Sequence, residues 1–176
     1  MNMNQFTQKT IEALQNAQRL AVEYSNQTVE QEHLLAALAQ QQDGLIPQLL
    51  HAMGVEPGTF ATAATEKVAA LPRVTGSGRD PDKVYISGDL DRALNAAESQ
   101  AKQMKDEYIS VEHVFLGILQ RPGKAASELF RQFGITTEKF MQQLSTVRGN
   151  QRVTSDNPEE TYNALKKYGQ DLVEMA

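Results

Sequence analysis

The stretch "EYISVEHVFLGIL", residues 107–119, has a counterpart 80 positions earlier in "QTVEQEHLLAAL", residues 27–38. Each stretch contains a Glu-His pair that is followed by a run of apolar residues. Two such pairs in one chain are either the halves of a divided catalytic site or the marks of an internal duplication. A duplication would determine the fold, and the rest of the sequence distinguishes it from a divided catalytic site.

An offset of 80 residues aligns the two halves of the chain without a gap. The identities fall at positions with structural roles and are Ala13/Ala93, Leu14/Leu94, Ala17/Ala97, Ala21/Ala101, Glu32/Glu112, His33/His113, Leu49/Leu129, Gly54/Gly134 and Phe60/Phe140. We therefore interpret the chain as a duplication. A unit of about 60 residues buries only ~60% of its unfolded surface, so the two halves are expected to pack together.

Each half shows the pattern of four helices. Apolar residues recur at helical spacing from Ile11 to Ala21, and Thr7 and Ser110 are suited to cap helix starts. Gly54 and Gly134 each follow a helical stretch and are suited to end it. The predicted fold is all-α, with two pseudo-symmetric four-helix repeats packed as one domain: repeat 1 at about 6–70, a connector at 71–88, and repeat 2 at about 89–148. Within the connector, "VYIS" (84–87) could lie against the domain in extended form.

Composition limits the classes of function. The 176 residues carry a net charge of −5 without a block of like charge, which argues against nucleic acid or an anionic membrane surface as partner. There is no cysteine, so disulfides and thiolate metal sites are excluded, and a reducing cytosol is favoured. The N-terminus lacks the pattern of a signal peptide, and the longest apolar run, 34–39, is far too short to cross a bilayer.

The sequence offers no enzyme motif. His33, His51 and His113 are scattered and lack the spacing of metal ligands, so no metal site is predicted. "GSG" at 76–78 has no strand-to-helix frame and no Gly-Lys-Ser/Thr, so it is not a phosphate loop. For the Glu-His pairs two interpretations stay open. The acids could face a ligand, or they could be first-turn residues stabilised by the helix dipole, with the histidines bonding to a neighbouring loop or packing under the apolar run; the second is favoured.

Three further stretches carry a family resemblance. "LPRVTGSG" (71–78), "DEYISVEHVFLGIL" (106–119) and "LKKYGQDLVEMA" (165–176), with the duplicated Glu-His helices, resemble the Clp N-terminal repeat domain of ClpB-type AAA+ disaggregase chaperones. The resemblance covers the whole chain. It implies a repeat domain at 1–148, a flexible linker at 149–159, and the start of the first AAA+ nucleotide-binding domain at 160–176. The sequence departs from the family at Gln31, where the family commonly has Pro before Glu-His.

The resemblance implies a substrate-recruiting domain that binds unfolded or aggregated polypeptides and passes them to an ATP-driven pore. The segment itself would be no enzyme and hold no cofactor. The parent protein would use ATP and Mg²⁺, form a homohexamer in the cytoplasm and cooperate with a DnaK-type chaperone, and the isolated domain would be a monomer. The resemblance implies substrate binding by Thr7, Leu94, Asp106, Glu112, His113 and Val114.

Each of these residues also has a plain structural interpretation. Thr7 suits an N-cap, Asp106 a turn, and Leu94 the core by its periodicity. An alternative function is that of the related ClpA/ClpC-type protease partners, whose N-domain docks adaptor proteins or phosphorylated arginine. In that case Glu32 and Glu112 would be paired acidic ligands for guanidinium groups.

Overall fold

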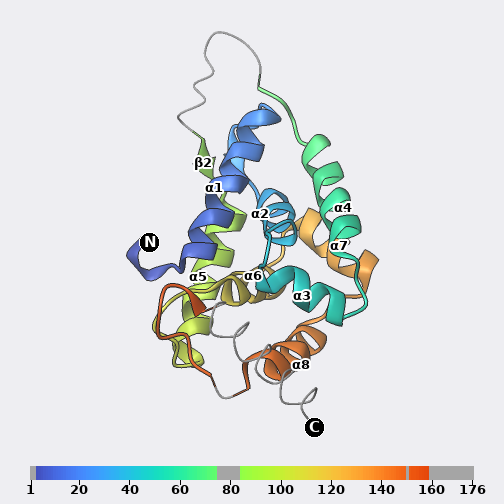
Figure 1. Cartoon of the computed structure of the whole chain (residues 1–176). Coiled ribbons are helices and arrows are strands. Elements are labelled where there is room, and N and C mark those ends of the chain that lie inside the picture. Colours follow the sequence, from blue (N-terminus) through green and yellow to red (C-terminus); the bar gives the residue numbers. More distant parts are fainter. Residues whose placement is uncertain (1–2, 75–83, 150, 159–176) are drawn as a thin grey trace.

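The computed structural model describes residues 3–74, 84–149 and 151–158, and in these ranges the chain forms two successive sets of four α-helices (Figure 1). The first set follows a short 3₁₀ turn at Met3–Gln5 and consists of α1 (Gln8–Glu23), α2 (Gln31–Ala39), α3 (Leu45–Ala52) and α4 (Pro57–Ala69). The second set consists of α5 (Gly88–Gln103), α6 (Val111–Gln120), α7 (Lys124–Phe133) and α8 (Thr137–Arg148). The all-α fold with paired four-helix repeats is thereby confirmed.

Local chemistry fixes the ends of these helices at equivalent places in the two repeats. The Thr7 hydroxyl accepts a hydrogen bond from the Thr10 N–H at the start of α1. The Ser87 hydroxyl does the same for the Leu90 N–H at the start of α5. Such caps satisfy backbone donors that the first turn of a helix leaves without a partner. Gly134 ends α7 in the left-handed conformation, with φ of 67°.

The two repeats exchange extended residues. β1 (Thr28–Val29) lies ahead of α2 and pairs in parallel with β2 (Tyr85–Ile86), which lies ahead of α5. The reciprocal contact is a parallel bridge between Phe6, ahead of α1, and Ile109, ahead of α6. The residues before the first helix of each repeat therefore pair with those before the second helix of the other, which joins the repeats into one body. The expectation that "VYIS" lies extended against the domain is confirmed by β2.

Helices α5 and α6 approach each other closely because Gly117 has no side chain. A Cβ at Gly117 would lie 2.2 Å from the backbone oxygen of Ala93 and 3.0 Å from the backbone nitrogen of Ala97. Both neighbours are backbone atoms, so they could not move aside without shifting α5. The small residues Ala93 and Ala97 on the facing side of α5 are fully buried in this contact.

Aromatic rings continue the core from one repeat into the other. Phe60 of α4 meets Phe133 of α7 edge-on, with ring centroids 5.3 Å apart, and α4 and α7 run side by side in Figure 1. Within the second repeat, Phe115 stacks on Phe140 at 4.7 Å and also contacts Phe130. Ring pairs of this kind add about 0.5–1.5 kcal/mol beyond the area that they bury.

Residues 151–158, here called the exit segment, lie against the domain beside the start of α1 (Figure 1). The Gln8 N–H donates to the Asp156 carbonyl at 2.8 Å, and the Glu107 N–H donates to the Val153 carbonyl at 2.8 Å. A flexible linker is expected over 149–159, whereas the exit segment makes specific backbone contacts. The predicted start of an AAA+ domain at 160–176 lies outside the described residues.

We predict that Gly117→Ala destabilises the protein by about 1–3 kcal/mol, because the added methyl group overlaps backbone atoms of α5. Urea unfolding followed by circular dichroism would measure this. Gly88→Ala is the matched control, since a Cβ there would meet only the Arg92 side chain at an ordinary 3.5 Å. Equal stability of the two variants would contradict the close helix contact.

Candidate functional site

The two duplicated histidines cap the helices on which they lie. Nδ1 of His33 accepts a hydrogen bond from the Glu30 N–H at 2.8 Å, and Nδ1 of His113 accepts one from the Ser110 N–H at 2.8 Å. Each histidine is the third residue of its helix and completes a capping box with the residue before the helix. Because Nδ1 accepts, the ring proton lies on Nε2, which then acts as a donor.

The second ring nitrogen of each histidine bonds to the residue seven positions earlier in the chain, and these two residues occupy equivalent positions in the repeats. Nε2 of His33 lies 2.8 Å from Oδ1 of Asn26, and Nε2 of His113 lies 2.6 Å from Oδ2 of Asp106. Asn26 in turn donates to the Pro72 carbonyl at 3.1 Å, just after the fourth helix of its repeat. Both histidines thus have structural partners on both ring nitrogens, which supports the helix interpretation of the Glu-His pairs.

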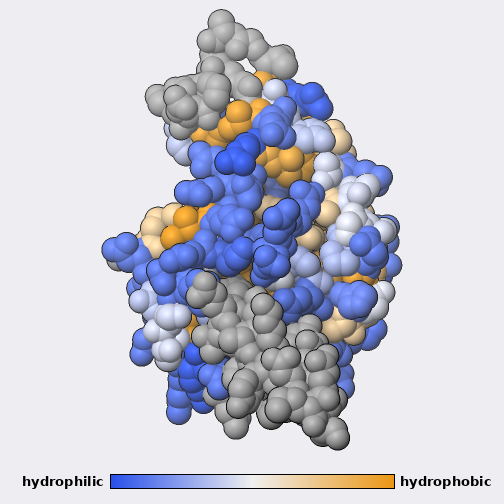
Figure 2. Space-filling model, in the orientation of Figure 1, coloured by the Kyte–Doolittle hydropathy of each residue, from blue (hydrophilic) through white to orange (hydrophobic). Residues whose placement is uncertain are grey.

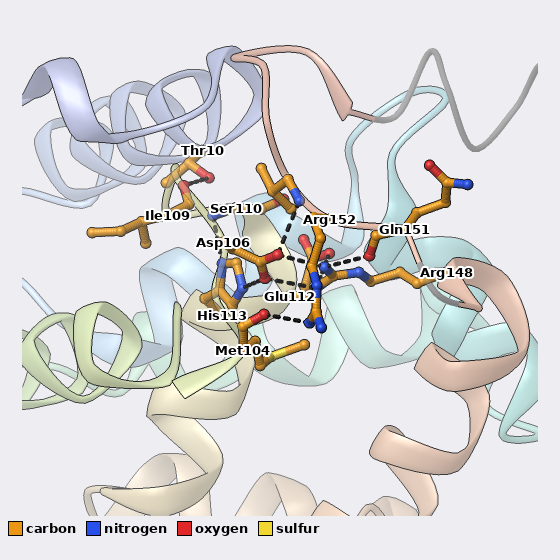
Figure 3. Close-up of polar contacts among 11 residues, drawn as sticks. Thr10, Met104, Asp106, Ile109, Ser110, Glu112, His113, Arg148, Gln151 and Arg152 are labelled. Carbon is orange, nitrogen blue, oxygen red and sulfur yellow. Dashed lines mark hydrogen bonds and ion pairs between the residues drawn. The ribbon is translucent and has the colours of Figure 1, made fainter. Parts of the chain in front are cut away.

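In the second repeat this arrangement includes a buried ion pair (Figure 3). Arg148, at the end of α8, donates to both carboxylate oxygens of Asp106, with Nη2–Oδ1 at 2.7 Å and Nη1–Oδ2 at 2.9 Å. The Val153 N–H also donates to Oδ1, at 2.9 Å. Burial favours the neutral acid, but the hydrogen bonds from His113, Arg148 and Val153 outweigh it and hold the pKa of Asp106 well below its ordinary value. The carboxylate is therefore charged at physiological pH.

Glu112 is sealed beneath Arg148. Its side chain is fully buried, and Oε2 lies 3.5 Å from Nη1 of Arg148. Among the described residues neither carboxylate oxygen of Glu112 has a hydrogen-bond partner, so the ion pair is its principal compensation. The guanidinium group of Arg148 thus contacts two buried acidic side chains, Asp106 and Glu112. The sequence analysis gave no role to Arg148, since nothing in its local pattern marks it.

The structure places all six residues for which substrate binding is expected in the interior. Five of them are at most 3% exposed, and the side chain of the sixth, Asp106, is fully buried. The six residues are Thr7, Leu94, Asp106, Glu112, His113 and Val114. Asp106, Glu112 and His113 are brought together around Arg148, whereas Thr7 caps α1 and Leu94 packs in the core. Their contact with clients stays a prediction, and their structural roles are the ones described above.

An open concave surface lies where the repeats meet and is here called the inter-repeat groove. Its cavity volume is about 430 Å³, and it is lined by the start of α2, the end of α4 and its following residues, the start of α5, and the start of α7. Four carboxylates, two lysines and three apolar residues are among the lining residues: Glu30, Glu32, Asp89, Glu128, Lys67, Lys124, Ala70, Leu71 and Ala125. Lys67 and Glu128 form an ion pair across the repeats.

Glu32 is the most buried of these acids, at 7% exposure. Burial, and beyond it the charges of Glu30 and Asp89, raise the pKa of Glu32 above its ordinary value. Glu32 thus lies at an electronegative surface, while its counterpart Glu112 is enclosed with Arg148. The expected pair of acidic ligands is not brought together, because only its first member reaches the groove.

A second, polar groove of about 540 Å³ lies between α1 and α2 and includes Lys9, Arg19, Glu23 and Asp43. Figure 2 shows that hydrophilic residues cover most of the face seen in Figure 1, with hydrophobic residues gathered in its upper part between α1 and α4. In the described ranges no group of three or more acidic, His or Cys side chains could hold a metal ion. None of the helices described is long and apolar enough to cross a membrane.

Gln31, at the point where the sequence departs from the family, joins the two repeats. Its Nε2 donates to the carbonyls of Asp89 and Arg121, both at 2.9 Å, and its Oε1 accepts from the Gly123 N–H at 2.8 Å. Proline is well suited to a first helical position but could make none of these bonds. The departure from the family at Gln31 therefore adds three hydrogen bonds between the repeats.

We predict that Gln31→Leu lowers the free energy of unfolding by about 2–4 kcal/mol, because three backbone groups lose their hydrogen-bond partner. Chemical unfolding would measure the change. Gln18→Leu, at an exposed position of α1, is the control and should stay within about 0.5 kcal/mol of the parent chain. A Gln31→Leu variant as stable as the control would show that these bonds contribute little.

We also predict that His33 makes the fold sensitive to mild acid. Burial lowers the pKa of His33 from 6.5 to about 4, so the unfolded chain binds a proton between these values that the folded chain does not. The contribution of neutral His33 to the free energy of unfolding is therefore present in full above pH 6.5. It is lost as the pH falls towards 4, by at most about 1.4 kcal/mol per pH unit.

The comparison of the parent chain with His33→Gln isolates this effect. Urea unfolding at pH 7, 6 and 5 should show the stability advantage of the parent chain shrinking with each step. Because His51 and His113 are common to both proteins, their titration cancels in the difference. An advantage that stays constant over this range would refute a lowered pKa at His33.

Comparison with known proteins gives a consistent result. Residues 5–133 match the family described as the Clp repeat (R) N-terminal domain. The chain is 45% identical over its whole length to "Chaperone protein ClpB" of Nitratidesulfovibrio vulgaris and 46% identical over 98% of its length to the ClpB of Bacillus anthracis. The chain spans about a fifth of the length of these relatives.

Solved structures agree in fold. The Hsp104 N-terminal domain of Candida albicans is 25% identical and superposes with a TM-score of 0.75, covering 88% of this chain and 98% of that one. The N-domain of ClpV in complex with a VipB peptide is 19% identical, with a TM-score of 0.63, and covers 84% of this chain and 89% of that one. With its duplicated His-capped helices and its two four-helix repeats, the chain belongs to the Clp repeat N-terminal domain family.

Proposed function

We propose that the chain is the substrate-recruiting N-terminal domain of an ATP-dependent protein disaggregase, which binds unfolded or aggregated polypeptides and passes them to ATP-driven domains. The similarity to ClpB chaperones along the whole chain supports this role. A domain that hands its client on must release it, so binding should be weak. A dissociation constant of ~10 μM to 1 mM corresponds to roughly 4–7 kcal/mol.

The observation that carries the proposal is the inter-repeat groove. It is concave, reaches solvent, and combines the apolar residues Ala70, Leu71 and Ala125 with an excess of carboxylates over lysines. Unfolded chains expose apolar segments, and an acidic rim favours those that also carry Lys or Arg. The groove can thus bind many clients, because neither feature requires a particular sequence.

The six buried residues fit this proposal through the surface that they support. His113 caps α6 by accepting a hydrogen bond from the Ser110 N–H, and Asp106 joins His113 to Arg148, so these residues fix the frame of the second repeat. We propose that substitutions there alter client binding through the position of neighbouring elements. In the longer protein, ATP, a hexameric ring and a DnaK-type partner belong to the same proposal.

The test is a titration of the chain with two matched unfolded peptides, one rich in Leu and Arg and one rich in Leu and Ser. We expect chemical-shift changes at the inter-repeat groove with both peptides, and tighter binding of the Arg peptide. Glu32→Gln should lower the affinity for the Arg peptide by about 3–10-fold, because it removes an acidic partner of the guanidinium group. The affinity for the Ser peptide should be unchanged.

Glu12→Gln, on the polar groove between α1 and α2, is the control and should bind both peptides as the parent chain does. Shifts that fall outside the inter-repeat groove would refute the proposed surface. A tight one-to-one complex with a small folded adaptor, without binding of either peptide, would favour the protease-partner alternative instead.

A further inference from the structure

The exit segment is held by contacts along its length. Val153 is fully buried, its carbonyl accepts from the Glu107 N–H, and its own N–H donates to Asp106. Beyond it, Asp156 accepts from both the backbone and the side chain of Gln8, at 2.8 and 3.1 Å. These residues follow the last helix yet pack as part of the domain.

A single carboxylate connects the exit segment to the helices. Asp106 accepts hydrogen bonds from His113 of α6, from Arg148 at the end of α8, and from the Val153 N–H of the exit segment. Arg148 also donates to the Gln151 carbonyl at 2.9 Å, so the guanidinium group holds the segment as well. Figure 3 shows His113 and Arg148 converging on Asp106. Removal of the Asp106 charge would leave the buried Arg148 and its neighbours without their central partner.

We infer that Asp106 is the anchor of a clamp that docks the exit segment and thereby fixes where the chain leaves the domain. Asp106 and Arg148 are then positioning residues, which act on the path of the following chain. With the clamp closed, the exit segment stays docked on the domain. With it open, the eight residues of the exit segment become tether, which extends the reach of the domain by up to about 28 Å. This inference does not depend on the client surface.

The first repeat provides the matched control. Asn26 bonds to His33 as Asp106 bonds to His113, but it holds the residues after α4 through the Pro72 carbonyl. Asn26→Ala therefore removes an equivalent buried hydrogen-bonding residue without touching the exit segment. A purely global loss of stability would affect both variants alike, whereas a clamp predicts a local difference.

The test is amide hydrogen exchange, followed by NMR, on the 176-residue chain, its Asp106→Asn variant and its Asn26→Ala variant. In Asp106→Asn we expect exchange at the Glu107 and Val153 amides to accelerate at least tenfold relative to Leu116 in the core of α6. Trypsin should also cleave after Arg152 at least tenfold faster. In Asn26→Ala the Glu107 and Val153 amides should exchange as in the parent chain, relative to Leu116.

Three results would overturn the inference. They are unprotected Glu107 and Val153 amides in the parent chain, an equal acceleration at Leu116 in Asp106→Asn, and acceleration at Glu107 and Val153 in the control. If Asp106→Asn does not fold, Arg148→Met replaces it. This variant removes the two hydrogen bonds from the guanidinium group to Asp106 and keeps the bond between Asp106 and His113. The same readouts and the same criteria then decide.

Discussion

Reciprocal pairing of extended residues between the repeats is the constraint on which the fold depends. The residues ahead of α1 bond to the second repeat at Ile109, and those ahead of α5 bond to the first repeat at Val29. The caps Thr7 and Ser87 directly follow these contacts, and their own N–H groups donate to the carbonyls of Ile109 and Val29 at 3.1 Å. The starts of α1 and α5 are thus fixed by the opposite repeat. One repeat alone would lose these backbone partners.

Equivalent positions in the two repeats have the same geometry and different chemistry. The seventh residue before the capping histidine is neutral Asn26 in one repeat and charged Asp106 in the other. Only the charged residue needs a cation, and Arg148 supplies it while covering Glu112. The first repeat has no such requirement at the aligned position, Val68, and its acid reaches the inter-repeat groove. The repeat that has Asp106 thus encloses its acid, Glu112, whereas the repeat that has Asn26 leaves its acid, Glu32, at the surface of the groove.

The sequence predicts what depends on local pattern. The duplication, the helix starts after Thr7 and Ser110, and the all-α class follow from spacing, capping chemistry and periodicity. The pairing of β1 with β2 could not be predicted from the sequence, because a strand of two residues shows no periodic pattern. The roles of Gln31 and Arg148 were missed for a different reason. Their partners among the helices lie 36 to 92 residues away in the sequence, so only the packed helices bring them together.

The electrostatics of the inter-repeat groove suit transient binding of cationic segments. Burial, and beyond it the charges of Glu30 and Asp89, raise the pKa of Glu32, so an incoming cation would relieve repulsion as well as form an ion pair. The gain is limited, because Lys67 already pairs with Glu128 at the rim and exposed ion pairs contribute only about 0–1 kcal/mol each. Affinity would then have to come from several weak contacts along an extended chain. Such a surface would select for unfolded polypeptide, which can follow the groove, over a folded protein that touches it at one point.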